Sequence, residues 1–230
     1  MRRCELTKTG LALLLLSGLL GMQAGCSRSS DSDPGGVGPV PTPTSGSGVP
    51  TPTPTAVIVD APGANLTDII KNFPNGATIV VSPGTYGPIE LTGADVSGPL
   101  TLVADETGSF TGRPGTITIL AQDKDAAIDL DGLNNVVLDG ISTNGGRIAG
   151  VLIANGSQIV LLNSKIRGAT GDGVRIDRSS AVLMFNNLIH ANQGVGLRAR
   201  GVNTMEVVNN TIYGNVSGGL AFLRIAFPGG

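Results

Sequence analysis

The sequence is poor in cysteine, in aromatic residues and in charge. Its 230 residues include two cysteines, no tryptophan and only 3% aromatic residues. Two cysteines allow at most one disulfide, which excludes a small disulfide-stapled scaffold. Few aromatic rings leave little material for the stacking platforms on which many neutral-sugar sites are built. Because the formal net charge is −2, the composition also disfavours nucleic-acid binding, which needs a basic surface.

Glycine, by contrast, is abundant and regularly spaced. Four glycines lie 23 residues apart, at Gly150, Gly173, Gly196 and Gly219. The apolar residues that follow them form two columns, Val151, Val174, Leu197, Leu220 and Ile153, Ile176, Ala199, Phe222. Upstream, Ala127, Ile128 and Leu130 keep the same phase. A unit of this size cannot bury its own apolar face, so the spacing predicts a solenoid of stacked coils.

A second strand is expected in each repeat, and an asparagine follows it. Its inward residues alternate at period two, as Ile159 with Leu161, Val182 with Met184, and Met205 with Val207. The asparagines are Asn163, Asn186 and Asn209, and the isoleucines three residues later are Ile166, Ile189 and Ile212. Asparagine donates and accepts hydrogen bonds and tolerates the backbone angles of a tight turn. We therefore expect the three asparagines to form a structural ladder.

Coils of 23 residues, with short strands and turns rich in Gly, Asn, Asp and Ser, resemble the right-handed parallel β-helix of the pectin-lyase superfamily. The resemblance concerns the fold and covers about residues 60–230. It includes a short helix at 65–73 with Asn65 as N-cap, a first strand within 76–86, and irregular coils at 100–103 and 116–120. The expected fold class is all-β: a right-handed parallel β-helix with a short N-terminal capping helix, which would cover the open first coil.

The N-terminal residues predict export. Arg2, Arg3 and Lys8 precede the apolar run 11–20, which is too short for a stable membrane span. This pattern is typical of a secretory signal peptide, and we place it at residues 1–25. Its removal would also take away Cys4, which leaves the mature chain without a disulfide.

The signal peptide ends at Gln23-Ala-Gly-Cys26, which resembles a bacterial lipobox. The resemblance implies that Cys26 is the lipid attachment site, and a serine in second place, here Ser27, implies the outer membrane in Gram-negative lipoproteins. Gln23 departs from the pattern, because an apolar residue is usual there. The alternative is ordinary signal cleavage, which would give a secreted or periplasmic protein.

The domain order follows from composition. Residues 26–58 are rich in Pro, Thr, Ser and Gly and almost free of apolar residues, so we expect an unfolded, semi-stiff tether. Residues 59–126 would form the N-terminal cap and irregular coils, and residues 127–230 the regular repeats.

Outward side chains of the strand after each glycine form two further columns. The first reads Asp129, Leu152, Arg175, Arg198, Ala221, and the second Asp131, Ala154, Asp177, Arg200, Leu223. Stacking brings equivalent positions within about 4.8 Å of each other. The columns therefore predict a ligand-binding patch for an anionic polymer on two adjacent coils, made of Arg175, Asp177, Arg198 and Arg200.

In the pectate-lyase branch of the superfamily, carboxylates on such a face hold calcium against an acidic sugar and a basic residue removes a proton. The resemblance implies Asp129, Asp131 and Asp177 as calcium ligands, and Arg175 or Arg198 as the catalytic base. It rests on location, since no motif matches. The alternative is structural, because Asp177 can pair with Arg175 or Arg200 across the ladder.

The last coil begins at 219–222, and no capping element follows it in the sequence. Because solenoids need a terminal cap, we expect a longer protein, an end-to-end contact with a second copy, or residues 225–228 folded across the end. The single histidine, His190, shares a turn column with Arg167 and Tyr213 and is expected to be solvated.

These patterns predict a lipid-anchored cell-envelope β-helix protein. It would act as a binding or structural surface module for an extended polymer such as an anionic polysaccharide. The alternative is a calcium-dependent polysaccharide lyase of the pectate-lyase type, against which the uniformly short turns between residues 127 and 222 argue. No cofactor other than calcium and no nucleic-acid partner is expected.

Overall fold

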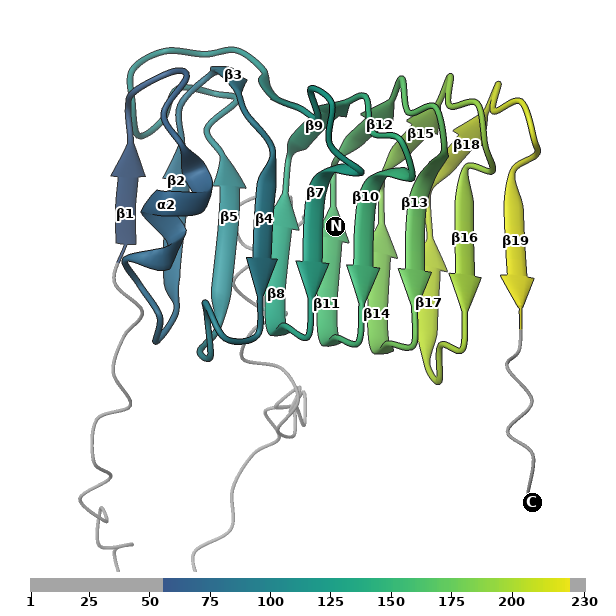
Figure 1. The fold of residues 1–230 in the computed structure, drawn as a ribbon. Coiled ribbons are helices and arrows are strands. Elements are labelled where there is room, and N and C mark those ends of the chain that lie inside the picture. The colour runs from purple at the N-terminus through teal and green to yellow at the C-terminus, as the bar shows by residue number, and fades with distance from the viewer. Residues whose placement is uncertain (1–55, 224–230) are drawn as a thin grey trace, which may run out of the picture. The chain divides into compact units, whose positions relative to one another are not determined.

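Residues 56–223 of the chain, which the computed structural model describes, stack into a parallel β-solenoid. Three parallel sheets run along it, and one short helix lies at its N-terminal end (Figure 1). This confirms the expected fold class. The predicted signal peptide, the lipidated Cys26, the tether as far as residue 55 and the segment 225–228 lie outside the described residues. Within residues 56–223, no helix has the length and apolar character needed to cross a membrane.

Each complete coil contributes one strand to each sheet, and β1 adds a seventh strand to one of them. The seven-stranded sheet contains β1 (Ala56–Val59), β2 (Ala77–Val81), β5 (Leu100–Ala104), β8 (Asn134–Asp139), β11 (Ser157–Leu162), β14 (Ser180–Phe185) and β17 (Met205–Val208). The β3–β18 sheet contains β3 (Gly84–Tyr86), β6 (Ile117–Leu120), β9 (Ile141–Asn144), β12 (Lys165–Arg167), β15 (Leu188–His190) and β18 (Thr211–Tyr213). The β4–β19 sheet contains β4 (Ile89–Thr92), β7 (Ala126–Asp131), β10 (Ala149–Ala154), β13 (Asp172–Asp177), β16 (Leu197–Arg200) and β19 (Leu220–Leu223).

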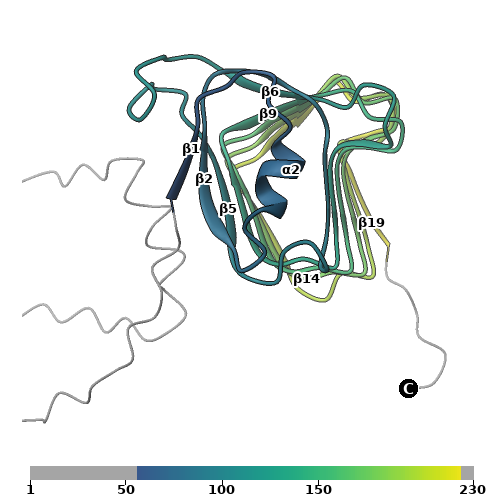
Figure 2. The same cartoon turned by 60° about the vertical axis from the view of Figure 1, so that its left-hand side comes forward.

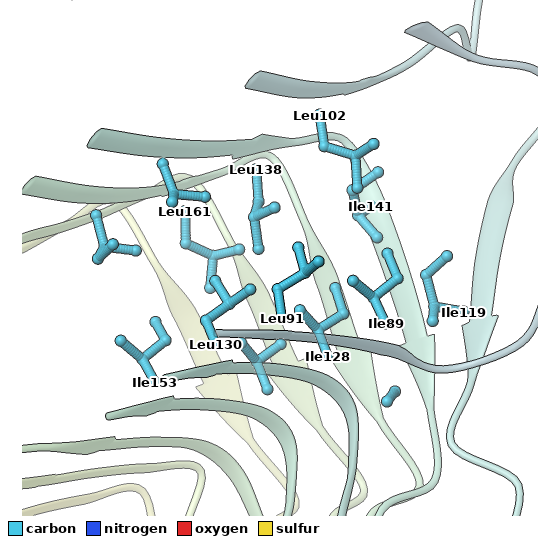
Figure 3. Packing of buried hydrophobic residues seen from close by; sticks show 14 of the residues in the cluster. Ile89, Leu91, Leu102, Ile119, Ile128, Leu130, Leu138, Ile141, Ile153 and Leu161 are labelled. Atoms are coloured by element: carbon cyan, nitrogen blue, oxygen red, sulfur yellow. The ribbon is translucent and has the colours of Figure 1, made fainter. Parts of the chain in front are cut away.

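The strand registers confirm the predicted apolar columns. Val151 pairs with Val174 and Ile153 with Ile176, so equivalent residues of successive coils lie directly beside each other. These side chains are fully buried in one continuous core. Figure 3 shows residues of the three sheets facing one another across this core. Since each coil covers the apolar side chains of the next, the core extends through the whole stack rather than closing within a repeat.

The glycine column has a steric cause. A Cβ atom on Gly173 would lie 2.6 Å from the carbonyl oxygen of Gly196 and 2.6 Å from Cγ2 of Ile189. The equivalent atom on Gly150 would lie 2.7 Å from Cγ2 of Ile166. A side chain therefore has no room where the chain turns into the β4–β19 sheet, and this is why glycine recurs every 23 residues.

Asparagines form three ladders at two corners, and the predicted ladder is one of the three. Asn186 Nδ2 donates to Asn163 Oδ1 at 2.7 Å, and the backbones of Asn163, Asn186 and Asn209 all have positive φ. These three side chains are exposed. This ladder thus joins successive coils by side-chain hydrogen bonds on the outer side of the corner.

Two further asparagine ladders face inward. Asn187 Oδ1 accepts from the backbone N–H of Ser164 at 2.9 Å, and Asn210 Oδ1 accepts from the N–H of Asn187 at 2.9 Å. At the next corner, Asn215 Oδ1 accepts from the backbone and the side chain of Asn192. Asn187 and Asn192 are buried, so their side-chain amides form hydrogen bonds with backbone groups that water cannot reach.

The expected helix is present as α2 (Leu66–Lys71). Asn65 is its N-cap and accepts a hydrogen bond from the backbone N–H of Asp68, as predicted. Leu66 and Ile70 are buried in the same core as the coils. Figure 2 shows α2 in front of the space that the coils enclose, so the helix covers the N-terminal end of the stack.

Candidate functional site

The outward side chains of the β4–β19 sheet, which we call the β4–β19 face, stand in the two predicted columns. The registers place Arg175 between Leu152 and Arg198, and Asp177 between Ala154 and Arg200. The columns also extend one strand further than predicted, because Glu90 pairs with Asp129 and Thr92 with Asp131. The face is consequently acidic on β4 and β7, apolar on β10, and rich in arginine on β13 and β16. These strands lie at the front of Figure 1.

Asp177 holds two of the arginines. Arg200 binds it through two parallel hydrogen bonds, from Nε and Nη2, both at 2.7 Å, and Arg175 Nε donates to it at 3.0 Å. The hydrogen bond from Arg200 lowers the pKa of Asp177 and that from Arg175 adds to this, while burial opposes it. The same bond raises the pKa of Arg200. The predicted pairing of Asp177 is therefore confirmed, with Arg200 across the ladder and with Arg175 on the same strand.

Asp172 holds the third arginine, and the sequence did not reveal this role. Its carboxylate accepts from Arg198 Nε at 2.6 Å and Nη2 at 3.1 Å, and from the backbone N–H of Val195 at 2.9 Å. The residue is 5% exposed. It occupies an inward column whose neighbours in register are Ala149 and Ala126. A charged residue in a column of alanines was the signal that could have identified it.

These ion pairs bear on the catalytic role that resemblance implied. A general base must give up its proton before it can take one, and the hydrogen bond that Arg198 donates to Asp172 raises the pKa of Arg198 instead. Arg175 is likewise engaged by Asp177. The geometry thus makes both side chains fixed hydrogen-bond donors rather than poised bases.

The implied calcium site does not form, because its three carboxylates do not meet. Asp131 and Asp177 lie on either side of Ala154 in the same column, two coils apart, and Asp177 is already occupied by arginines. Among residues 56–223, no group of three or more His, Cys, Asp or Glu side chains is placed to hold a metal ion. The expected use of Asp129, Asp131 and Asp177 as one site is therefore corrected.

The acidic end of the face has its own electrostatic character. Burial raises the pKa of Asp129, and the charges of Asp131, Glu90 and Asp125 raise it further. Glu90 forms an ion pair with Lys124 at 3.1 Å. Both also line a polar hollow of about 470 Å³ between α2 and the loop before β4, together with Asn65, Thr67, Asp68 and Gln122. The hollow continues the face toward the N-terminal end, because Glu90 belongs to both.

The outward side chains of the β3–β18 sheet form a second face, which we call the β3–β18 face. Arg167, His190 and Tyr213 stand in one column, as predicted, and Lys165, Leu188 and Thr211 in the other. The His190 and Tyr213 rings stack in parallel, with centroids 5.2 Å apart. Burial lowers the pKa of His190, and the charges of Lys165 and Arg167 lower it further. This histidine is thus half-buried rather than simply solvated.

The last coil that the structure describes exposes large apolar side chains. Leu220, Phe222 and Leu223 are each about half exposed or more, with Phe222 at 60%. These residues lie on β19, the last strand of its sheet. The end-to-end contact with a second copy stays a prediction.

Comparison with known proteins gives a result at the level of the fold. Residues 102–224 match the family described as "Right handed beta helix region", which is more than half of the chain. The chain belongs to this right-handed β-helix family. No curated protein matches the sequence of this β-helix protein.

A solved structure similar to this β-helix protein is a variant catalytic domain of a GH87 α-1,3-glucanase in complex with tetrasaccharides. The sequence identity is 18% and the TM-score is 0.38. The similarity covers 76% of this chain and 40% of that chain. The β-helix protein therefore spans well under half of the glucanase domain.

Proposed function

We propose that this β-helix protein is a lipid-anchored cell-envelope module that binds an extended polysaccharide along the β4–β19 face. The in-register columns support this, because successive coils present equivalent side chains at a spacing of about 4.8 Å. A linear polymer with repeating groups is the ligand class that suits a repeating surface. The polar hollow beside Glu90 and Lys124 lies at the N-terminal end of the same face.

The arginine network is the observation on which the proposal rests. Arg175, Arg198 and Arg200 are only 25%, 29% and 41% exposed, and carboxylates hold each of them. Guanidinium groups that are fixed before a ligand arrives lose little entropy on binding. The hydrogen bonds to the two aspartates use Nε of all three arginines and Nη2 of Arg198 and Arg200, so Nη1 of each donates to neither aspartate. Sugar hydroxyls are acceptors for these remaining N–H groups.

The lyase alternative has weaker support from the same residues. Its implied base, Arg198, has a raised pKa, and its implied calcium ligands are separated by Ala154. Elimination also needs a proton acceptor and a cation close to one sugar ring. The β4–β19 face instead offers donors and carboxylates that are already paired.

The binding proposal is tested with two arginine variants on a panel of neutral and acidic polysaccharides. We expect Arg200→Ala to weaken binding about tenfold, or about 1.4 kcal/mol, while Asp177 keeps Arg175 as a partner. Arg198→Lys keeps the charge beside Asp172 but loses the planar fork, and should weaken binding severalfold. Arg147→Ala is the matched control, because Arg147 is 68% exposed and pairs with Asp125. Unchanged affinity in both variants would show that the β4–β19 face is not the polysaccharide-binding site.

The lyase alternative is tested in the same samples. Calcium is added to the acidic polysaccharides, and the ultraviolet absorbance of an unsaturated product is followed over time. A rise that disappears in Arg198→Ala, with that variant still folded, would replace the binding proposal by the lyase. A flat trace together with measurable binding supports the module.

The lipid anchor rests on the sequence Gln23-Ala-Gly-Cys26 and on the tether that follows it. A labelled fatty acid fed to expressing bacteria should be incorporated into the protein. The label should be absent from Cys26→Ser and present in Cys4→Ser. Incorporation into Cys26→Ser would contradict the anchor, and an unlabelled, exported wild type would favour the secreted or periplasmic alternative.

A further inference from the structure

The cations of the two outer faces differ in their partners. On the β4–β19 face, each of the three arginines forms an ion pair with Asp172 or Asp177. On the β3–β18 face, Lys165 and Arg167 are exposed, and within residues 56–223 neither forms an ion pair or a side-chain hydrogen bond. Two cations without a protein partner on one short strand constitute an unbalanced positive charge.

The strand geometry directs these two cations to the same side. Lys165 and Arg167 are two residues apart on β12, and side chains at this spacing point to the same face of a sheet. Ile166 between them is fully buried in the core, which places both neighbours on the outside. Their charged groups can therefore contact one anionic group, or two successive ones, from the same direction.

The neighbouring coils add an aromatic surface beside the charge. His190 lies next to Arg167 in register, and Tyr213 lies next to His190. Tyr213 is 55% exposed, although aromatic residues make up only 3% of the sequence. An aromatic ring that keeps half of its surface in water is available for contact with the apolar C–H face of a sugar ring.

Among residues 56–223, the two charges that shift the pKa of His190 are both positive. The pKa of His190 is lowered by burial and by the charges of Lys165 and Arg167. The imidazole consequently stays neutral at neutral pH and serves as apolar support for Tyr213. The positive charge of the face thus comes from Lys165 and Arg167.

From this juxtaposition we infer that the β3–β18 face is a second ligand site, at which Lys165 and Arg167 bind the carboxylate of one residue of an acidic polysaccharide and Tyr213, two coils further along, contacts the ring of a neighbouring residue. This inference rests on the proposed binding of a polysaccharide, and it assigns recognition of acidic groups to a face other than the one with the paired arginines. A polyuronate supplies what this site requires, a carboxylate for the two cations and, on a neighbouring residue, a sugar ring with an apolar side for Tyr213.

The test compares polygalacturonate with its methyl ester, which is neutral, using the full chain at low ionic strength. The wild type should bind the acid about tenfold more tightly than the ester. The double variant Lys165→Ala/Arg167→Ala should lose this preference and keep its affinity for the ester. Lys165→Arg/Arg167→Lys keeps both charges and should retain the preference, while Tyr213→Ala should weaken binding of both polymers about threefold.

The outcomes separate this inference from the proposed function. Arg200→Ala should weaken binding of acid and ester alike, and an effect of Arg200→Ala without an effect of the Lys165→Ala/Arg167→Ala variant would overturn the second site alone. Binding of neither polymer by the wild type would overturn both proposals. If the double variant instead lost binding to anionic lipid vesicles or single-stranded RNA and kept the preference for polygalacturonate, the face would belong to another partner and the inference would be wrong.

Discussion

The two outer faces of the solenoid are built from the same coils and the same 23-residue period, yet they treat charge in opposite ways. On the β4–β19 face, arginines are half-buried and held by carboxylates. On the β3–β18 face, Lys165 and Arg167 project into solvent without such partners in the described residues. The repeat therefore determines where a side chain stands, whereas its electrostatic role depends on whether a carboxylate lies on the same or the adjacent coil. Removing a carboxylate that pairs with the arginines of the β4–β19 face should therefore lower the free energy of unfolding, whereas removing Lys165 and Arg167 should not.

The largest difference is expected from Asp172. Replacing Asp172 by Ala removes the partner of Arg198 and leaves the backbone N–H of Val195 without its acceptor. We expect the free energy of unfolding to fall by about 3 kcal/mol, as when one member of a buried pair is removed. The midpoint of urea unfolding measures this. Asp125→Ala is the control, because its pair with Arg147 is exposed and should cost less than about 1 kcal/mol. Equal losses would contradict the comparison.

Asp177 should make stability depend on acid pH. Its pKa is lower in the folded protein than in the unfolded chain. The stabilisation is therefore complete above the unfolded pKa of about 4 and is lost as the pH falls through the lowered folded value. Asp177→Asn should cost about 2 kcal/mol at pH 7 and progressively less below about pH 4. Thermal unfolding between these pH values measures the difference, and a pH-independent gap between the two proteins would count against the ion pairs.

Asp129 should have a smaller effect of opposite sign. Its pKa is raised in the folded protein, so its contribution to stability is present below the unfolded pKa and is lost as the pH rises through the folded value. Asp129→Asn removes a charge that lies beside Asp131 and Glu90, and should stabilise the protein by about 0.5 kcal/mol at pH 7. The gain should vanish near pH 3. Stabilisation of the same size at both pH values would point to packing instead of charge.

The smallest effect is expected on the β3–β18 face. Lys165→Ala/Arg167→Ala should change the free energy of unfolding by less than about 0.5 kcal/mol, because exposed side chains without partners contribute little to folding. The same urea titration used for Asp172→Ala measures it. A loss of more than 1 kcal/mol, an order-of-magnitude threshold set by exposed ion pairs, would show that these cations have a structural partner after all.

Much of the fold could be predicted from the sequence because every coil of a solenoid repeats the same pattern of turns and of inward and outward residues. Gly150 and its equivalents marked the period, and the apolar triplets after them gave both the inward columns and the outward ones. The helix cap at Asn65 followed from local chemistry alone. The pairing of Asp177 with Arg200 also followed, since it requires only the register.

The remaining features depend on which side of a corner a residue faces. Asn186 and Asn187 are adjacent and both recur with the period, but Asn186 is exposed and Asn187 is buried. Periodicity treats the two alike, and only the backbone path at the corner separates them. Asp172 is the first residue of β13, and only the alanines at the equivalent positions 149 and 126 indicate from the sequence that it points inward. The calcium assignment failed on distance, since two positions in one column are close only when their coils are adjacent.

The inward asparagines make each coil a modular unit for evolution. Asn210 accepts the backbone N–H of Asn187, and Asn187 accepts that of Ser164, so every unit carries the acceptor that its predecessor needs. A duplicated 23-residue segment would contain both the backbone N–H donor and the asparagine acceptor of this contact. It would therefore require no compensating change in its neighbours. Gene duplication could thus lengthen or shorten such a stack by whole coils, and ligand specificity could then diverge through the outward residues alone.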